Sequence, residues 1–292
     1  MSSAAIDKCA ACGKEGDNLK ACTACFMVKY CNRDCQIAHR PMHKKECKKR
    51  AAELYDEKLF KEVEPEECPI CLLPMPIGRN NTTFEPCCGK RICNGCSYAM
   101  EMSEGKDLCA FCRTPKFCSD EEMIKRLKKL TDNGNANAFN QLASYYAQGL
   151  YGMPQDRQRA NEFNLKAGEL GCSDGYHNLA NAYYGGRGVE VDMKMAKHYW
   201  ELAAMNGHVK ARHNLSYIEE DAGKNERAYR HLLLAAKAGH EEALEGVKQG
   251  FQFGFVSKDE YASTLRAYQK RQNEMKSDER DKASIYYASG QD

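Results

Sequence analysis

From residue 118 onward, small, apolar and polar residues recur with a period typical of helical hairpins. Four glycines, Gly134, Gly171, Gly207 and Gly239, are separated by 37, 36 and 32 residues. Eight positions after each comes an aliphatic residue, and alanines precede the last three at fixed distances. These residues are Leu142, Leu179, Leu215 and Val247, then Ala160, Ala196 and Ala228, then Ala167, Ala203 and Ala235. Because small and aliphatic residues recur together at fixed distances from the glycines, the pattern predicts stacked helical hairpins. Their small residues let the helices pack closely.

Two further segments have the pattern of exposed helices. Residues 48–67 place a few apolar side chains among charges, which predicts a helix ending near Pro65. Residues 257–282 are heavily charged with one apolar stripe, which predicts a helix that caps the open end of the repeats. The tail after Ala283 is expected to fray.

Charge and hydropathy narrow the class of protein. The 292 residues carry a net charge of +2, which argues against a dedicated nucleic-acid binder. The first fifty residues carry +6, which we interpret as a solvated helix face. No window approaches 18 uninterrupted apolar residues and no signal sequence is recognisable, so we expect a cytoplasmic or nuclear protein without a membrane partner.

Cysteines are concentrated near the start of the chain, where 15 of the 17 lie within the first 112 residues in short-spaced pairs. Because cytosolic thiols stay reduced, such pairs indicate zinc, and disulfides would require export. The first series offers eight ligands, enough for two tetrahedral sites. Its members are Cys9, Cys12, Cys22, Cys25, Cys31, Cys35, His43 and Cys47. His39 falls outside the spacing and is expected at the surface.

This first series resembles a MYND zinc finger, including Tyr30 before Cys31 and Gln36 after Cys35. The resemblance implies that the ligand pairs alternate between two ions. Cys9, Cys12, Cys31 and Cys35 would hold one ion, and Cys22, Cys25, His43 and Cys47 the other. Both sites would be fully ligated, so the finger is expected to act in recognition. The family binds proline-containing peptides with a tryptophan at the position of Arg40, so such a peptide partner would lack its aromatic platform here.

A second series of eight cysteines follows. Its members are Cys68, Cys71, Cys87, Cys88, Cys93, Cys96, Cys109 and Cys112. The layout resembles a RING finger through its Cys-Pro-Ile-Cys opening, the spacing of its last four cysteines, and the Arg-Thr-Pro that follows them. It departs from that family at Lys90, where a histidine ligand is expected, because an ammonium group cannot coordinate metal.

Cys87 can restore the ligand count beside Cys88. The resemblance, with this replacement, would put Cys68, Cys71, Cys93 and Cys96 on one zinc and Cys87, Cys88, Cys109 and Cys112 on the other. Successive side chains tend to diverge, so one ligand plus one buried thiol stays open as an alternative. The expected cofactor is zinc, with four ions in the chain, or three if that last site is incomplete.

RING fingers of ubiquitin ligases hold a charged ubiquitin-conjugating enzyme and do no covalent chemistry themselves. The resemblance implies that Ile70 contacts this enzyme, that Tyr98 or Met100 adds a central-helix contact, and that Pro115 forms the second loop. Arg113 follows the last cysteine, and its planar five-donor head suits a bridge between ubiquitin and its carrier enzyme. The alternatives are a local core residue for Ile70 and a surface salt bridge for Arg113.

The repeated region resembles Sel-one-like repeats, relatives of the tetratricopeptide repeat, most clearly around the glycine-rich residues 185–189. That segment lacks the strand and the Lys-Ser/Thr of a phosphate loop, so it is expected to be a turn between helices. The expected fold is mostly α, with two small cross-braced zinc fingers joined to a short right-handed α-solenoid. Its domains would be a MYND-type finger (1–50), a helical linker (51–66), a RING-like finger (67–116), the repeats (117–256) and a capping helix with a tail (257–292).

These features favour two functions. The leading hypothesis is a RING-type ubiquitin ligase in which the solenoid binds the substrate or client protein. The alternative is a non-enzymatic adaptor or scaffold whose fingers only bind partner proteins. A corepressor-like factor acting through the first finger is a third possibility, and it would need a bound peptide despite Arg40. No motif of a small-molecule enzyme is recognisable in the sequence.

Overall fold

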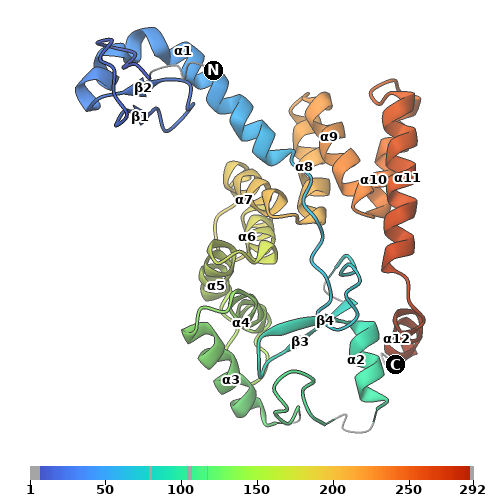
Figure 1. Ribbon diagram of the computed structural model, residues 1–292. Helices are drawn as coiled ribbons and strands as arrows, with labels where there is room; N and C mark the ends of the chain where they lie inside the picture. Colours follow the sequence, from blue (N-terminus) through green and yellow to red (C-terminus); the bar gives the residue numbers. More distant parts are fainter. Residues whose placement is uncertain (1–6, 79–80, 104–106, 117, 290–292) are drawn as a thin grey trace, which may run out of the picture. The chain divides into compact units, whose positions relative to one another are not determined.

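The computed structural model describes residues 7–78, 81–103, 107–116 and 118–289. Twelve helices and two short antiparallel sheets account for the regular structure in these ranges (Figure 1). The prediction of a mostly α fold is confirmed. The chain forms two compact units, Met1–Lys61 and Glu62–Asp292, whose boundary lies inside the predicted linker.

The first unit consists of a small sheet and one long helix. Strand β1 (Lys20–Ala21) pairs with β2 (Lys29–Tyr30), and α1 (Arg33–Leu59) follows directly. The helix begins where the Asn32 side chain accepts a hydrogen bond from the third helical N–H at 2.9 Å, which is a stabilising N-cap. It therefore combines the helix of the first finger and that of the linker. It ends at Leu59, so the prediction of an end near Pro65 is wrong.

The second unit is built mainly from helices that pack pairwise. α4 packs on α5, α6 on α7, and α8 on α9, in the order in which they follow one another along the chain (Figure 1). The helices are α3 (Asp120–Asp132), α4 (Ala136–Gln148), α5 (Arg157–Glu169), α6 (Ser173–Gly185), α7 (Met193–Met205), α8 (Val209–Asp221), α9 (Asn225–Lys237) and α10 (Glu241–Gln252).

The four recurring glycines follow α3 and the second helix of each of the three hairpins, α5, α7 and α9. Their φ angles are 74°, 97°, 83° and 101° for Gly134, Gly171, Gly207 and Gly239. The N–H that follows each glycine donates to a carbonyl five residues back, as in a Schellman motif. These bonds join Asn135 to Leu130 (3.0 Å), Cys172 to Ala167 (2.9 Å), His208 to Ala203 (3.0 Å) and His240 to Ala235 (3.1 Å). The sequence period thus arises from a turn that needs a left-handed residue.

The recurring alanines, leucines and valine form the core between these helices. All ten are at most 3% exposed. A Cβ on Gly175 would lie only 2.5 Å from the carbonyl oxygen of Asn164, so α5 and α6 approach closely enough to require small residues. Trp200 is buried between α7 and α6 and donates from Nε1 to Oδ1 of Asn181 at 3.1 Å.

The second finger belongs to the same compact unit as the repeats. β3 (Thr82–Glu85) pairs antiparallel with β4 (Lys90–Cys93), and α2 (Asn94–Glu101) follows. Arg91 on β4 forms an ion pair of 2.8 Å with Asp174 on α6. The finger is thereby anchored to the repeat helices.

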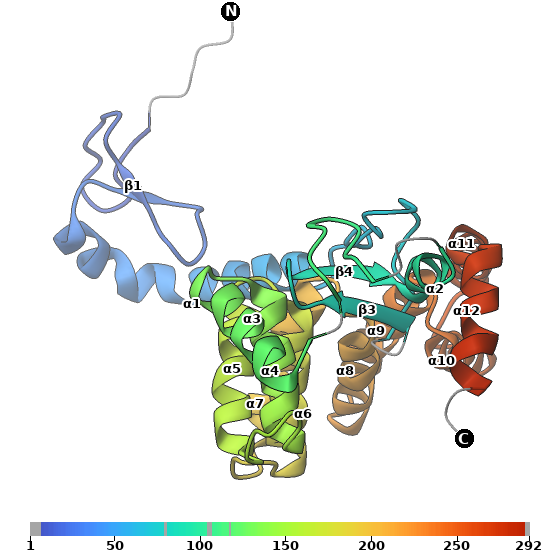
Figure 2. The same cartoon turned by 90° about the horizontal axis from the view of Figure 1, so that it is seen from below.

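The C-terminal region departs from the expected single helix and frayed tail. Two helices, α11 (Lys258–Met275) and α12 (Asp278–Ser289), follow the repeats. The expectation that the chain frays after Ala283 is wrong, because this residue is fully buried within α12 and the Tyr287 hydroxyl donates to Glu101 on α2 at 2.9 Å. Figure 1 and Figure 2 both show α12 beside α2.

Candidate metal centres

Four Cys-x-x-Cys knuckles in the two fingers share one backbone conformation. The residue after the second cysteine has a left-handed φ, and its N–H donates to the carbonyl of the first cysteine at 2.8–3.0 Å. These residues are Gly13, Phe26, Leu72 and Arg113, with φ of 74°, 57°, 59° and 59°. The sharp turn brings the two sulfurs of a knuckle toward one point, which is what a shared ion requires.

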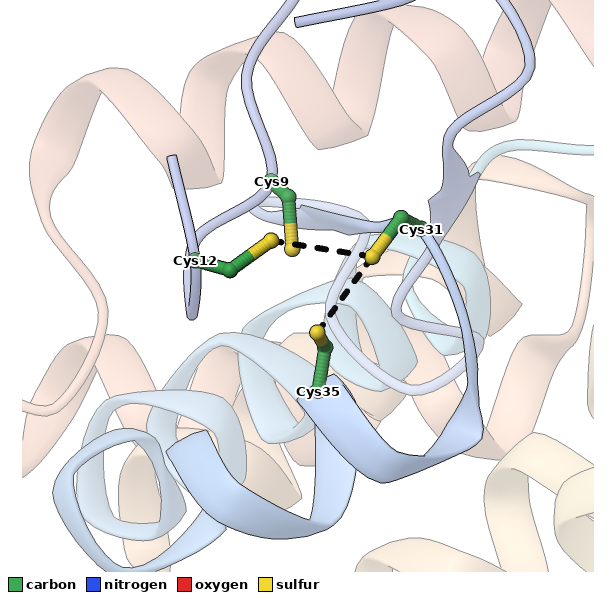
Figure 3. Close-up of side chains that lie close together, drawn as sticks. All are labelled: Cys9, Cys12, Cys31 and Cys35. Carbon is green, nitrogen blue, oxygen red and sulfur yellow. Dashed lines mark hydrogen bonds between the residues drawn. The ribbon is translucent and has the colours of Figure 1, made fainter. Parts of the chain in front are cut away.

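The sixteen predicted ligand side chains gather in four groups. Within each group, all ligand atoms lie within 4.8 Å of one another. The groups are Cys9, Cys12, Cys31 and Cys35; Cys22, Cys25, His43 and Cys47; Cys68, Cys71, Cys93 and Cys96; and Cys87, Cys88, Cys109 and Cys112. Figure 3 shows the sulfurs of the first group pointing toward one another. The grouping has the alternation that the two resemblances imply.

The spacing of the sulfurs fits zinc and excludes disulfides. All 17 cysteines are free thiols. At least one sulfur pair is separated by 3.7 Å or 3.8 Å in each of the four groups, for example Cys12 and Cys31 or Cys71 and Cys93. Zinc–sulfur bonds of about 2.3 Å in a tetrahedron place sulfurs about 3.8 Å apart. The chain therefore has cysteine and histidine sites for up to four zinc ions, while the assignment of individual ligands remains a prediction.

Cys87 and Cys88 both turn toward the same group despite being adjacent. They lie in the tight turn between β3 and β4, where the N–H of Gly89 donates to the carbonyl of Glu85 at 2.8 Å. Such a turn changes the direction of successive side chains, which an extended strand would not do. Lys90, which occupies the position of the expected histidine, instead places its Nζ 4.4 Å from the ring centroid of Phe111.

The knuckles stabilise the ionised thiolate form of some of the cysteines in each group. Burial opposes ionisation of Cys22, but the backbone N–H groups of Ala24 and Cys25 lower its pKa to about 6. Burial of Cys47, together with hydrogen bonding and charge from Cys22, raises the pKa of that thiol to about 11. Four thiolates in one group repel one another, and a divalent cation is what allows all of them to ionise.

His43 is a buried ligand candidate with its own supporting residues. Its Nε2 lies 3.2 Å from Sγ of Cys25, and its ring stacks on His39 with centroids 5.6 Å apart. His39 is only partly exposed, and its Nδ1 lies 3.0 Å from the hydroxyl of Tyr30. His39 lies outside the four groups, as its place in the spacing predicts. It is more than a surface histidine, because its partly buried ring contacts Tyr30 and stacks on the candidate ligand His43, as outer residues of zinc sites commonly do.

Two further residues at these sites were missed from the sequence. Gly95 lies on α2 between the candidate ligands Cys93 and Cys96, and Arg280 reaches Cys71 from α12. A glycine inside a short helix is a weak signal of close backbone approach. Nothing in the sequence distinguishes Arg280 from the many other charged residues near the C-terminus.

The residues predicted to contact a conjugating enzyme differ in accessibility. Ile70 is 40% exposed in its knuckle, and Arg113 and Pro115 are exposed beyond the last ligand. Tyr98 is tilted against Tyr286 of α12, with ring centroids 5.2 Å apart. Met100 packs against the buried cysteines of the third group, so of the candidate contacts it is the one committed to the finger's own core.

Comparison with known families assigns two of the regions. Residues 9–47 match the MYND finger family, and residues 137–172, 173–208 and 210–240 match the Sel1 repeat. The chain thus contains a MYND-type zinc finger followed by Sel1 repeats, as the sequence predicted. Modules of both kinds generally mediate protein–protein interactions. None of the helices in the described ranges has the length and apolar character needed to cross a bilayer.

Individual relatives cover only parts of this chain. Chitin synthase regulatory factor 4 of Schizosaccharomyces pombe (strain 972 / ATCC 24843) is 29% identical over 123 residues, which are 42% of this chain and 19% of that protein. The crystal structure of a Sel1 repeat protein from Oxalobacter formigenes has a TM-score of 0.44 at 23% identity, covering 51% of this chain and 64% of its own.

A third relative is c5321, a protective antigen of uropathogenic Escherichia coli strains with an SLR fold. It has a TM-score of 0.43 at 19% identity and covers 56% of this chain and 39% of its own. The matched regions span less than two thirds of each of these three proteins.

Proposed function

We propose that this protein is a RING-type ubiquitin ligase of the cytosol or nucleus. In this proposal the second finger recruits a ubiquitin-conjugating enzyme and the Sel1 repeats bind the client. The observation that carries it is the placement of Arg113, an exposed arginine immediately after the last zinc-ligand candidate, Cys112.

The backbone fixes Arg113 while its side chain remains available. The Arg113 N–H donates to the Cys109 carbonyl at 3.0 Å, and the Cys109 N–H donates to the Thr114 carbonyl at 2.9 Å. The carbonyl of Pro115 accepts from Arg126 at 2.8 Å, which holds the following loop. Among the described residues the Arg113 guanidinium has no ion-pair partner, so a surface salt bridge within the chain gains no support. An exposed guanidinium on a well-held backbone is suited to bidentate contacts with a second protein.

Reconstituted ubiquitin transfer tests the proposal. Purified protein with activating enzyme, a panel of conjugating enzymes, ubiquitin and ATP should form ubiquitin chains. Arg113→Ala and Ile70→Ala should each abolish chain formation without changing the zinc content measured by native mass spectrometry. Absence of chains across a broad panel would leave the adaptor function.

A matched control distinguishes the role of the Arg113 side chain from the effect of changing a left-handed residue in a zinc knuckle. Phe26 occupies the same left-handed position in the first finger, with φ of 57° against 59° for Arg113. Phe26→Ala makes the same kind of backbone substitution at a zinc knuckle and should leave ubiquitin transfer unchanged. Equal loss in both variants would show that knuckle geometry, and not the guanidinium, matters.

One observation favours the adaptor as the second candidate. The face of α2 that carries Tyr98 lies against α12, which would restrict a central-helix contact with a conjugating enzyme. An adaptor needs no such contact. The reconstitution above distinguishes the two functions, since an adaptor would bind clients without transferring ubiquitin.

A polar groove in the repeats is our candidate client surface. It lies between α4, α5 and α6 and encloses about 660 Å³. Its polar lining includes Asn161, Asn164, Asn178 and Asn181, with Arg157 and Arg187. Side-chain amides can pair with the backbone of an extended peptide, and arginine favours acidic groups on it. Arg157→Glu should therefore weaken client binding without changing zinc content.

A further inference from the structure

The start of α12 contacts the third cysteine group through one arginine. Nη2 of Arg280 lies 3.6 Å from Sγ of Cys71, and Nη1 donates to the carbonyl of Pro74 at 2.9 Å. Nη1 also donates to the carbonyl of Met275 at 2.7 Å, which ties the guanidinium to the end of α11. These bonds direct the Nη2 hydrogens toward the sulfur.

We propose that Arg280 is an outer-shell residue of the zinc site formed by Cys68, Cys71, Cys93 and Cys96. Its N–H group would donate to the Cys71 thiolate. The C-terminal helix α12 would then help to stabilise the metal site of the second finger. Four thiolates and one Zn²⁺ carry a net charge of −2, so a partly buried guanidinium beside them compensates charge that water would otherwise have to solvate. The proposal does not depend on ubiquitin transfer.

The packing of α12 on α2 shows that this approach is specific. A Cβ added to Gly95 would lie 2.8 Å from the backbone nitrogen of Arg280, closer than real Cβ contacts allow. Only glycine lets the start of α12 lie against α2 at this point, directly between the ligands Cys93 and Cys96. The Tyr287 hydroxyl fixes the far end of α12 to Glu101 at 2.9 Å.

Arg280→Met tests the donor while keeping an apolar stem of similar length. Loss of an outer-shell partner of a zinc ligand lowers metal affinity by about tenfold to a hundredfold. We therefore expect one zinc of the full-length protein to transfer to a chromophoric chelator about tenfold faster or more. Mass spectrometry of alkylated protein should show Cys71 reacting faster, because an N–H donor to sulfur lowers the nucleophilicity of a thiolate. Arg280→Lys should fall between Met and wild type, since it keeps one charge without the planar fork.

A control substitution and an internal reference show whether an effect is specific to Arg280. Arg266→Ala removes an exposed arginine from α11 and should change neither readout. The zinc sites of the first finger lie in the other compact unit and provide an internal reference within each sample. Unchanged zinc transfer and unchanged Cys71 alkylation in Arg280→Met would overturn the proposal.

Tyr287→Phe distinguishes hydrogen bonding by Arg280 from simple coverage by the helix. It removes the bond to Glu101 and leaves Arg280 intact. If Arg280→Met releases zinc faster than Tyr287→Phe does, the guanidinium itself acts on the site. If both variants release zinc equally fast, the helix acts only by burying the site, and the role assigned to Arg280 is wrong.

Discussion

The two zinc fingers and the Sel1 repeats are held together by different residues. In the first finger the buried cluster consists of Cys9, Cys22, Cys25 and Tyr30, so three of its four members are candidate ligands. The buried cluster of the last repeat helices is aliphatic, for example Leu232, Ala235, Ala236 and Val247. We infer that the fingers depend on bound metal for their stability, whereas the repeats depend on close packing of small residues.

Removing zinc should destabilise the first finger far more than the repeats, and this is the largest effect that we expect. A structural zinc site contributes on the order of 10 kcal/mol to folding in small zinc domains. A strong chelator should therefore abolish amide-exchange protection at β1, β2 and the start of α1 while α4–α9 remain protected. Re-addition of zinc should restore the protection. Persisting protection in the metal-free first finger would contradict our account of its folding.

A substitution in a buried charge cluster of the repeats should have the next largest effect on stability. Oε1 of Glu219 is fully buried and accepts from Lys197 at 2.8 Å and from Arg227 at 3.1 Å. Glu219→Gln should lower the free energy of unfolding by about 2–3 kcal/mol at pH 7, since hydrogen bonds to charged groups are lost. Urea unfolding followed by helical circular dichroism measures this. Glu220→Gln, at the exposed neighbouring position, should have almost no effect.

The same cluster should make the free energy of unfolding depend on pH, and the direction of that dependence follows from the pKa of Glu219. Burial opposes ionisation of Glu219, but the hydrogen bonds from Lys197 and Arg227 outweigh it and hold the pKa of this carboxyl below its ordinary value. A folded pKa below the unfolded value of about 4.3 stabilises the fold fully above that pH. The difference in stability between wild type and Glu219→Gln should shrink as the pH falls through the folded pKa. A difference that grows toward acid would contradict the assignment.

Gly95→Ala tests the contact between the second finger and the C-terminal helix α12. The added Cβ would press on the Arg280 backbone, and overpacking of this kind costs about 1–3 kcal/mol. Hydrogen exchange should show α12 becoming less protected while α4–α9 are unchanged. Gly16→Ala is the matched control, because no heavy atom lies within 4 Å of a Cβ at that position. Equal protection of α12 in Gly95→Ala and wild type would disprove the tight contact.

The smallest expected effect concerns the support of His43 in the first finger. His39→Ala removes the contact with Tyr30 and the stacked ring, worth about 1 kcal/mol for a net hydrogen bond. Zinc should leave this finger about fivefold faster in a chelator assay. Arg40→Ala, at the exposed next residue, should not change the rate.

Much of the candidate zinc chemistry was predictable because ligands follow local spacing. A Cys-x-x-Cys knuckle is a short-range structure, so Cys68 and Cys71 must reach one ion wherever the finger lies. The repeats were predictable for a related reason: each turn needs a left-handed residue, and glycine recurs with the period of the hairpin. The position of His39 was not predictable, since its partner Tyr30 lies on another element.

The residues and their spacing were enough to predict the mostly α character, the MYND-type finger, the Sel1 repeats and the supply of zinc ligands. The packing of whole elements was needed to bring both Cys87 and Cys88 to one group, to place the C-terminal tail as a helix on α2, and to bring Arg280 to Cys71. Separation along the chain explains this difference. Knuckles and repeats are set by residues close in sequence, whereas a contact between residues 209 positions apart depends on how whole elements pack.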